Sequence, residues 1–294
     1  MNVFDVVAAG AERLEKAGVC FGHGTDNASD EALFLSLHAL GYSYDTSEDL
    51  MHAELNSDQI SNVEQWIDKR IFTRKPAAYL TGYTWFCGYK FLTDENTLVP
   101  RSPFAELVLN RFEPWCEPDN VRHVLEIGTG GGCIAIAIAM RLHNTLVDAI
   151  DISDAALVVA KKNAAYHRVM DKVVFHCADL FPKTVTKYDL IVSNPPYVPN
   201  DVYDNLPIEY HAEPRLGLIA GEDGLDCVSR ILERAYDFLS DQGMLFIEVG
   251  EVWRELEIAY PLVPFTWVEL VRGGEGMLVL SKQQLLSIRT SESG

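Results

Sequence analysis

The sequence has few cysteines, and none of them is spaced as a pair. The 294-residue chain contains six, scattered without a Cys-x-x-Cys pair and in several cases inside apolar runs. Neither a disulfide framework nor a zinc site is indicated, and a reducing compartment such as the cytoplasm is expected. The eight histidines form no cluster with metal-ligand spacing, so no metal is predicted.

Long apolar runs are also missing. No stretch approaches the roughly 18 residues of a membrane span. The N-terminal segment carries acidic residues early, where a signal peptide would have a basic region. We therefore expect a soluble, cytoplasmic protein with no membrane partner.

Positive charge is scarce. The 24 Lys and Arg face 43 Asp and Glu, which gives a formal net charge of -19. A protein that holds nucleic acid must neutralise phosphates with Lys and Arg, so no stable nucleic-acid binding is predicted. An acidic surface either attracts a basic partner or keeps the protein in solution, and composition leaves both readings open.

Three segments follow one another along the chain. Residues 1–77 show helical periodicity, with Ser29 and Ser57 as the expected N-caps of two helices. Residues 78–104 mix aromatic and β-branched residues with turn residues, which predicts a β-hairpin linker. Residues 105–294 alternate short apolar strands with helices, as βαβ units do, so we predict an α/β domain with a mostly parallel sheet covered on both faces.

A glycine-rich turn stands at the start of this third segment. The strand Val124–Ile127 runs into Gly128-Thr129-Gly130-Gly131-Gly132 and then into a helix, which predicts a nucleotide-type cofactor. The dinucleotide fingerprint fails, because Cys133 occupies its third glycine position. Glu126 directly before the turn would repel a pyrophosphate. A cationic cofactor without phosphates fits better, and S-adenosylmethionine is one.

Two further acidic residues end the next predicted strands. Asp151 lies about 20 residues past Gly128, where doubly wound folds place a ribose-binding acid. Asp179 follows the next strand and could accept a hydrogen bond from the adenine amino group. An isolated strand-end Asp is more often a helix N-cap, but acids at successive strand ends favour cofactor binding.

The stretch Asn194-Pro195-Pro196-Tyr197 follows another apolar strand. Each proline keeps the preceding residue out of the α region, so the turn is stiff and extended. The Asn194 Oδ1 and the Pro195 carbonyl can then accept both hydrogens of one NH₂ group and aim its delocalised lone pair at a methyl donor. Tyr197 can pack against a planar acceptor.

Together these motifs resemble the class I S-adenosylmethionine-dependent methyltransferases. Further motifs resemble the protein-glutamine methyltransferases: Tyr79-Leu80-Thr81-Gly82, Leu98-Val99-Pro100-Arg101, Glu213-Pro214 and Gly221-x-Asp223-Gly224. The resemblance covers nearly the whole chain. It implies a Rossmann-like domain with a seven-stranded, mostly parallel sheet, preceded by a hairpin connector and a small helical domain that recognises the protein substrate.

One segment distinguishes two branches of that family. Release-factor methyltransferases typically have Pro-Arg-Pro-Asp-Thr-Glu, whereas this chain reads Pro100-Arg101-Ser102-Pro103-Phe104-Ala105-Glu106. The Arg-Ser-Pro pattern and Trp85-Phe86-Cys87-Gly88 are similar to the branch that acts on the third protein of the large ribosomal subunit. Such a substrate is basic, which suits an acidic enzyme. Glu248, at the end of another core strand, is given no catalytic role.

The predicted site is therefore as follows. The residues expected to act in catalysis are Asn194, Pro195 and Tyr197. The residues expected to bind the cofactor are Glu126, Gly128, Thr129, Gly130, Gly132, Asp151, Ile152, Asp179, Leu180, Asn194 and Arg101. The residues expected to bind the target glutamine are Asn194, Pro195, Pro196, Tyr197, Pro100 and Arg101.

Three alternatives remain. A release-factor methyltransferase would share the whole site. An adenine-N6 methyltransferase of nucleic acids would use the same chemistry on a flipped base. It would need a track of basic residues along the nucleic acid, and the best candidate is Lys69-Arg70 with Arg74-Lys75. Such a cluster is more commonly the solvated end of a helix. A non-catalytic S-adenosylmethionine-binding module would have little use for Asn194 and Tyr197.

Overall fold

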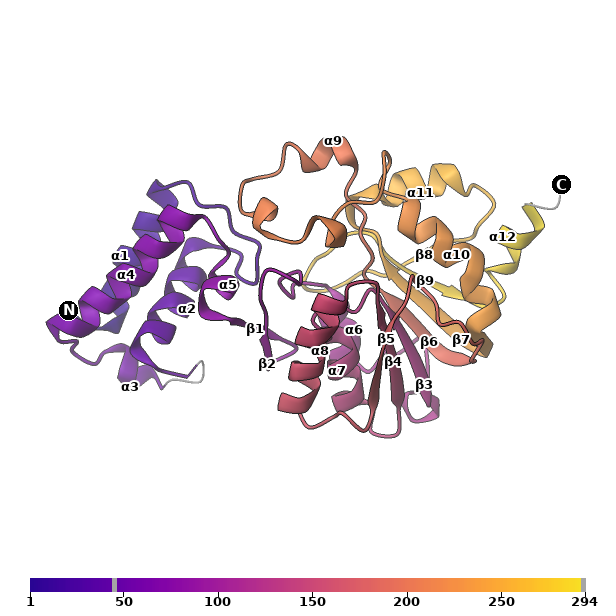
Figure 1. Ribbon diagram of the computed structural model, residues 1–294, viewed down its shortest axis with the longest axis horizontal. Coiled ribbons are helices and arrows are strands. Elements are labelled where there is room, and N and C mark those ends of the chain that lie inside the picture. Colours follow the sequence, from indigo (N-terminus) through magenta and orange to yellow (C-terminus); the bar gives the residue numbers. More distant parts are fainter. Residues whose placement is uncertain (44–46, 292–294) are drawn as a thin grey trace.

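The computed structural model describes residues 1–43 and 47–291 (Figure 1). Its N-terminal part is a group of helices whose apolar faces meet in one core that includes Leu14, Leu35 and Ile67. The helices are α1 (Val3–Lys16), α2 (Ala28–Leu40), α3 (Glu48–Met51), α4 (Ser57–Thr73) and α5 (Ala77–Thr81). The expected helical region is present, and its division from the linker at residue 77 stays a prediction because α5 continues to Thr81.

The predicted N-caps were wrong. Asn27 caps α2 by accepting a hydrogen bond from the Asp30 amide, so Ser29 lies inside the helix. Asn56 caps α4 by accepting from the Gln59 amide, and the Gln59 side chain accepts in turn from the Asn56 amide. Asparagine side chains reach these amides as well as serine does. The predicted caps were offset by two residues at α2 and by one residue at α4.

A β-hairpin follows the helices, as predicted. Its strands are β1 (Tyr83–Phe86) and β2 (Tyr89–Leu92), paired antiparallel. Asn163 anchors the hairpin, because its Oδ1 accepts from the Leu92 amide at 2.7 Å and its Nδ2 donates to the Leu92 carbonyl at 2.9 Å. The same Nδ2 donates to the Gly131 carbonyl at 2.9 Å. One side chain thus ties the hairpin to the glycine turn.

The C-terminal part contains the predicted sheet. Seven strands lie in the order β5-β4-β3-β6-β7-β9-β8, and all pairs from β5 to β7 are parallel. The last two pairings, β7 with β9 and β9 with β8, are antiparallel. The strands are β3 (His123–Ile127), β4 (Leu146–Asp151), β5 (Val173–Cys177), β6 (Tyr188–Ser193), β7 (Leu239–Glu248), β8 (Thr266–Trp267) and β9 (Met277–Ser281).

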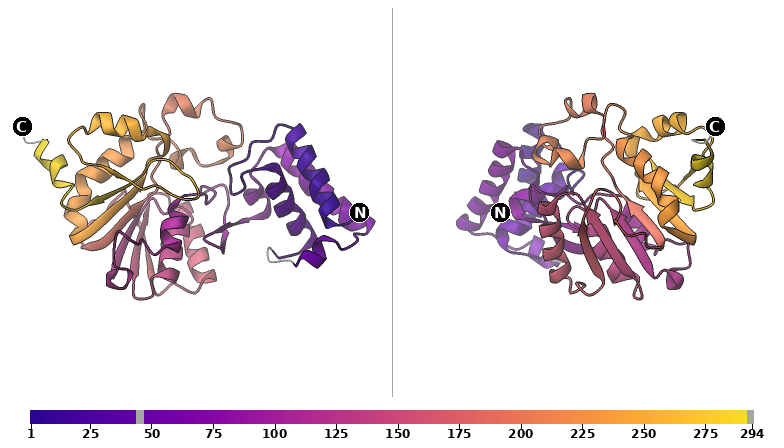
Figure 2. Two further views of the ribbon diagram at one scale, coloured as in Figure 1. Left: turned by 180° about the vertical axis from the view of Figure 1, so that it is seen from behind. Right: turned by 45° about the vertical axis from the view of Figure 1, so that its right-hand side comes forward.

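Helices cover both faces of this sheet (Figures 1 and 2). Successive strand residues point to opposite faces, so Val124 joins a core with α6 and α7 while its neighbour Leu125 joins a core with α10. The helices of this part are α6 (Phe104–Leu109), α7 (Cys133–Arg141), α8 (Asp154–Tyr166), α9 (Asn200–Tyr203), α10 (Asp226–Phe238), α11 (Trp253–Ala259) and α12 (Leu286–Ser291).

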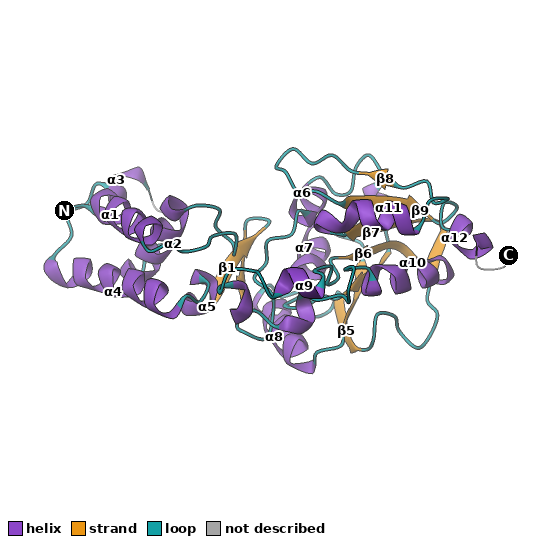
Figure 3. Ribbon diagram, turned by 90° about the horizontal axis from the view of Figure 1, so that it is seen from above, coloured by secondary structure: helices purple, strands orange, loops and turns teal. Residues whose placement is uncertain are grey.

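The strand order has one switch point, between β3 and β6. The chain leaves β3 towards β4 and β5 on one side and returns to β6 and β7 on the other. Ligands of open α/β sheets bind outside the carboxyl ends of the strands at such a point. Figure 1 shows α9 and its loops at the top of the molecule, and Figure 3, seen from above, places them between the N-terminal helices and the last strands of the sheet. Among the described residues, no helix is long and apolar enough to cross a membrane.

Candidate active site

The glycine turn follows β3 directly at the switch point. The amides of Gly128 and Thr129 both donate to the Ile150 carbonyl, at 2.9 and 2.8 Å. The Gly130 amide donates to Asp151 Oδ2 at 2.7 Å. Gly128 needs its positive φ of 74° for this path. Because these amides already have protein partners, they are not available to hold a pyrophosphate.

Glu126 lies beneath the turn and is 1% exposed. Its Oε2 accepts from the Thr129 hydroxyl at 2.5 Å and from the Ala135 amide, in the first turn of α7, at 2.8 Å. Burial raises the pKa of Glu126 to about 8, although both hydrogen bonds lower it. The carboxyl group therefore occupies the helix N-terminus that would receive a phosphate in a dinucleotide-binding turn.

The other predicted cofactor residues gather at the carboxyl ends of β4 and β5. Asp151 Oδ1 accepts from the Ser153 amide at 2.8 Å, and burial raises its pKa against the hydrogen bonds from Ser153 and Gly130. Ile152 next to it is 54% exposed. Asp179 pairs with Arg230, with 2.6 Å between Oδ2 and a guanidinium nitrogen. Its contact with adenine, like that of the half-buried Leu180, stays a prediction.

The Asn194-Pro195-Pro196-Tyr197 turn begins where β6 ends. Ser193 is paired with Ile127 in the sheet, and its hydroxyl donates to the Ile127 carbonyl at 2.9 Å. Asn194 and Gly128 are therefore the next residues on two adjacent strands. A Cβ atom on Gly128 would lie 3.7 Å from the Asn194 carbonyl oxygen. The structure thus brings the amide motif and the glycine turn together.

Tyr197 is held by Glu248, a residue that the sequence reading left without a role. The Tyr197 hydroxyl donates to Glu248 Oε1 at 3.1 Å, and the Ser102 hydroxyl donates to Glu248 Oε2 at 2.5 Å. Burial raises the pKa of Glu248 to about 7, while the hydrogen bonds from Ser102 and Tyr197 lower it. A buried strand-end acid was the available signal, but its partners are distant in the sequence.

Arg101 is held in turn by Glu213. The guanidinium donates to both carboxylate oxygens, at 2.7 and 2.6 Å, and Glu213 Oε1 also accepts from the Val99 amide at 2.9 Å. Burial raises the pKa of Glu213, but His23 and Arg101 outweigh it and lower the pKa to about 2. The Glu-Pro motif had pointed to this residue without giving it a partner. Glu213 fixes the path of the segment that contains Pro100.

This arrangement fits a cofactor that carries positive charge and no phosphate. The turn amides have internal partners, while the ends of β4 and β6, on the two sides of β3, carry the carboxyl group of Asp151 and the amide carbonyl of Asn194 as acceptors. The described ranges contain no group of three or more His, Cys, Asp or Glu side chains that could hold a metal ion. The fold and site define a class I S-adenosylmethionine-dependent methyltransferase.

The comparisons with known proteins lead further. Residues 105–206 match the Methyltransferase small domain family. The chain is 44% identical over 287 residues to the ribosomal protein uL3 glutamine methyltransferase of Xanthomonas campestris, covering 97% of this chain and 93% of that protein. It is 38% identical to the enzyme of the same name from Francisella tularensis, covering 98% and 92%. A solved methyltransferase structure from Pyrococcus furiosus aligns with a TM-score of 0.48 at 18% identity, covering 65% of this chain and 88% of that one.

The chain belongs to the ribosomal protein uL3 glutamine methyltransferases. Its cofactor is S-adenosyl-L-methionine, which supplies a methyl group on a positively charged sulfur. The expected fold, enzyme class and cofactor are thereby confirmed. The roles of the individual site residues remain predictions.

Proposed function

We propose that this protein transfers a methyl group from S-adenosyl-L-methionine to the side-chain amide nitrogen of a glutamine in ribosomal protein uL3. The observation that carries the proposal is the position of Asn194 directly beside Gly128 at the switch point of the sheet. A methyl donor in the glycine turn and an amide bound at the Asn-Pro-Pro-Tyr turn would then be neighbours. The relatives at 38–44% identity support the same substrate.

The residues of the turn supply orientation. An amide nitrogen is a poor nucleophile because its lone pair is delocalised into the carbonyl group. In our proposal the Asn194 Oδ1 and the Pro195 carbonyl accept one N–H each, which fixes the direction of the lone pair. A neutral acceptor suits this reaction, because positive charge develops on the nitrogen only in the transition state.

The remaining residues hold this turn and the segment facing it. Tyr197 packs against the planar amide, and Glu248 fixes its hydroxyl. Pro100 and Arg101 cover the target glutamine, and Glu213 fixes their backbone and guanidinium. Methyl transfer leaves one excess proton on the amide nitrogen, and this proton passes to water, so we assign no general base. The helical region of residues 1–77 serves to recognise the substrate protein in this proposal.

The basic cluster that would have favoured a nucleic-acid substrate has other partners. Arg70 is fully buried and pairs with Glu31 at 2.8 Å. Arg74 pairs with Glu209 at 2.9 Å, and Lys75 pairs with Glu95. These charges therefore face carboxylates of the protein, and with a net charge of -19 we propose a basic protein substrate and no stable nucleic-acid binding. The cytoplasm, where ribosomal proteins are made, stays the expected compartment.

The test is methyl transfer from labelled S-adenosylmethionine to purified uL3, with a release factor and an adenine-containing oligonucleotide as competing substrates. We expect label on a glutamine of uL3 and a loss of about 100-fold or more in kcat for Asn194→Ala. Label on the release factor would assign the chain to the sister activity. Label on adenine alone would refute a protein substrate.

A further inference from the structure

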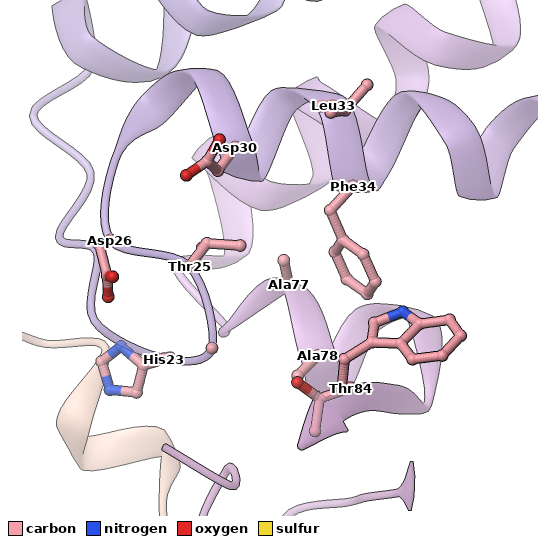
Figure 4. Close-up of a pocket in the computed structure, with 11 residues that line it drawn as sticks. His23, Thr25, Asp26, Asp30, Leu33, Phe34, Ala77, Ala78 and Thr84 are labelled. Atoms are coloured by element: carbon pink, nitrogen blue, oxygen red, sulfur yellow. The ribbon is translucent and has the colours of Figure 1, made fainter. Parts of the chain in front are cut away.

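A pocket opens in the N-terminal region (Figure 4). Its cavity volume is about 150 Å³, similar to the roughly 150 Å³ cavity that holds a benzene ring in an engineered protein. It lies between the loop before α2, the first turns of α2 and α5, and strand β1. It therefore has room for one side chain of a bound protein.

Two carboxylates stand at this pocket. Asp26 and Asp30 line it, and both are exposed. The Asp30 carboxylate accepts from the Asn27 side chain at 2.8 Å and has further lone pairs free. For the Asp26 carboxylate, the described part of the chain shows no hydrogen bond or ion pair. Figure 4 shows it directed towards the ring of His23.

His23 supplies an unpartnered buried group at the same place. The residue is 2% exposed, and within the described ranges its Nδ1 has no hydrogen-bond partner. Its Nε2 lies 3.5 Å from Glu213 Oε2. Like Nδ1, this Nε2 has no hydrogen-bond partner within the described ranges, so both ring nitrogens have hydrogen-bonding capacity that the protein does not use. The two carboxylates beside it accept hydrogen bonds only, so a ligand that suits them carries donors and positive charge.

The other walls are apolar. Leu33, Phe34, Ala77 and Ala78 line the pocket together with Trp85 of β1. Arginine and lysine side chains combine a donor-only cationic head with a stem of methylene groups that packs on such surfaces. An indole ring also attracts a cation placed over its face.

We propose that this pocket receives an arginine or lysine side chain of the protein substrate and so docks the substrate on the helical region. The inference rests on the proposed function, because it identifies how the same enzyme selects a basic protein. The pocket is also connected to the catalytic segment: Glu213, which lies beside His23, holds Arg101 through two hydrogen bonds. One substrate could therefore contact both places.

The experiment compares the unaltered enzyme with the double variant Asp26→Asn/Asp30→Asn, using full-length uL3. The control is Asp58→Asn/Asp171→Asn, which makes the same change in net charge at two exposed residues outside the pocket. Asp58 lies in the first turn of α4, as Asp30 does in α2, so effects on helix stability are matched. The readouts are KM, kcat, binding of uL3 by calorimetry, and the urea midpoint.

We expect the pocket variant to raise KM and the Kd for uL3 roughly fivefold or more, with kcat and the urea midpoint unchanged. Replacing the docked Arg or Lys of uL3 by Gln should raise KM for the unaltered enzyme and have no further effect on the pocket variant. Unchanged KM, or an equal rise in the control, overturns the docking proposal. If the unaltered enzyme binds uL3 but does not methylate it, the proposed function alone is refuted. If the unaltered enzyme does not bind uL3, both the proposed function and the docking proposal are refuted.

Discussion

The substitution Glu213→Gln tests the anchor of the segment beside the active site. Glu213 is buried and accepts from the Val99 amide and from both terminal nitrogens of Arg101. Glutamine keeps the size of the side chain but removes its charge and one of its two acceptor oxygens. Arg101 would then lie 27% exposed without its counter-ion, and one of its N–H groups would lose its partner.

Two estimates of the stability lost in Glu213→Gln agree. The pKa of Glu213 is about 2 in the folded protein, against 4.5 for an unperturbed Glu, and each unit corresponds to about 1.4 kcal/mol, so the charge stabilises the fold by roughly 3 kcal/mol. Breaking a buried ion pair costs about 3–5 kcal/mol, and the partial exposure of Arg101 favours the lower end. Because the folded-state pKa is depressed, this stability is present above pH 4.5 and is lost as the pH falls towards 2.

Urea unfolding of the wild-type protein and Glu213→Gln checks this. We expect the variant to be less stable by about 3 kcal/mol at pH 7 and by roughly half as much at pH 3. Methyl transfer should fall as well, because the path of Val99–Arg101 is no longer fixed. The control is Glu222→Gln, at an exposed site in the same connection. A difference in the free energy of unfolding between wild type and Glu213→Gln below about 1 kcal/mol at pH 7, or one that does not change with pH, would refute the role of Glu213 as a charged anchor.

Two other substitutions address the residues around the cofactor and the target amide. In Gly250→Ala the added Cβ would lie 2.6 Å from Tyr197 Cε2, so the tyrosine ring must move. We expect the free energy of unfolding to fall by about 1–3 kcal/mol and kcat to fall at least tenfold. An unchanged kcat would show that the position of the ring is unimportant for the reaction. Glu126→Gln removes a titrating group whose pKa is raised to about 8 in the folded protein. Because the folded wild type holds its proton more tightly than the unfolded chain does, its free energy of unfolding should fall by up to about 5 kcal/mol relative to the variant as the pH rises from 4.5 to 8. Parallel stability curves over that range would contradict it.

The fold could be predicted because its signals are local. Each strand of the parallel sheet is a short apolar run bounded by polar or turn residues, and each helix between strands has its own periodicity. The hairpin turn at Cys87-Gly88 was equally visible. The two-residue strand β8 (Thr266–Trp267) was not, because two residues carry no periodicity and pair only through β9. The offset N-caps at Asn27 and Asn56 show the same limit at helix ends.

The motifs of the site could also be predicted, but the residues that hold them could not. Asn194 and Gly128 each follow a strand, and the parallel order of strands alone places them side by side. Glu213 lies 112 positions from Arg101, and Glu248 lies 146 positions from Ser102. No pattern within a window of residues connects such pairs. The partners of Arg70 and Arg74 were hidden for the same reason: both belong to a cluster expected to be solvated, yet they pair with the buried carboxylates of Glu31 and Glu209.

The two anchors of the Arg101-Ser102 segment differ in kind, and the difference explains a feature of the sequence. Glu213 has a cationic partner, so it stays charged at any physiological pH. Glu248 has only hydroxyl partners, so burial dominates and its pKa of about 7 lets its proton exchange near neutrality. Ser102 donates to Glu248 and accepts from the Phe104 amide at 3.1 Å. The proline that release-factor enzymes typically carry at this position has no hydroxyl for either bond. Arg-Ser-Pro is therefore more than a marker of the branch, because its serine is the contact that fastens this segment to the strand behind Tyr197.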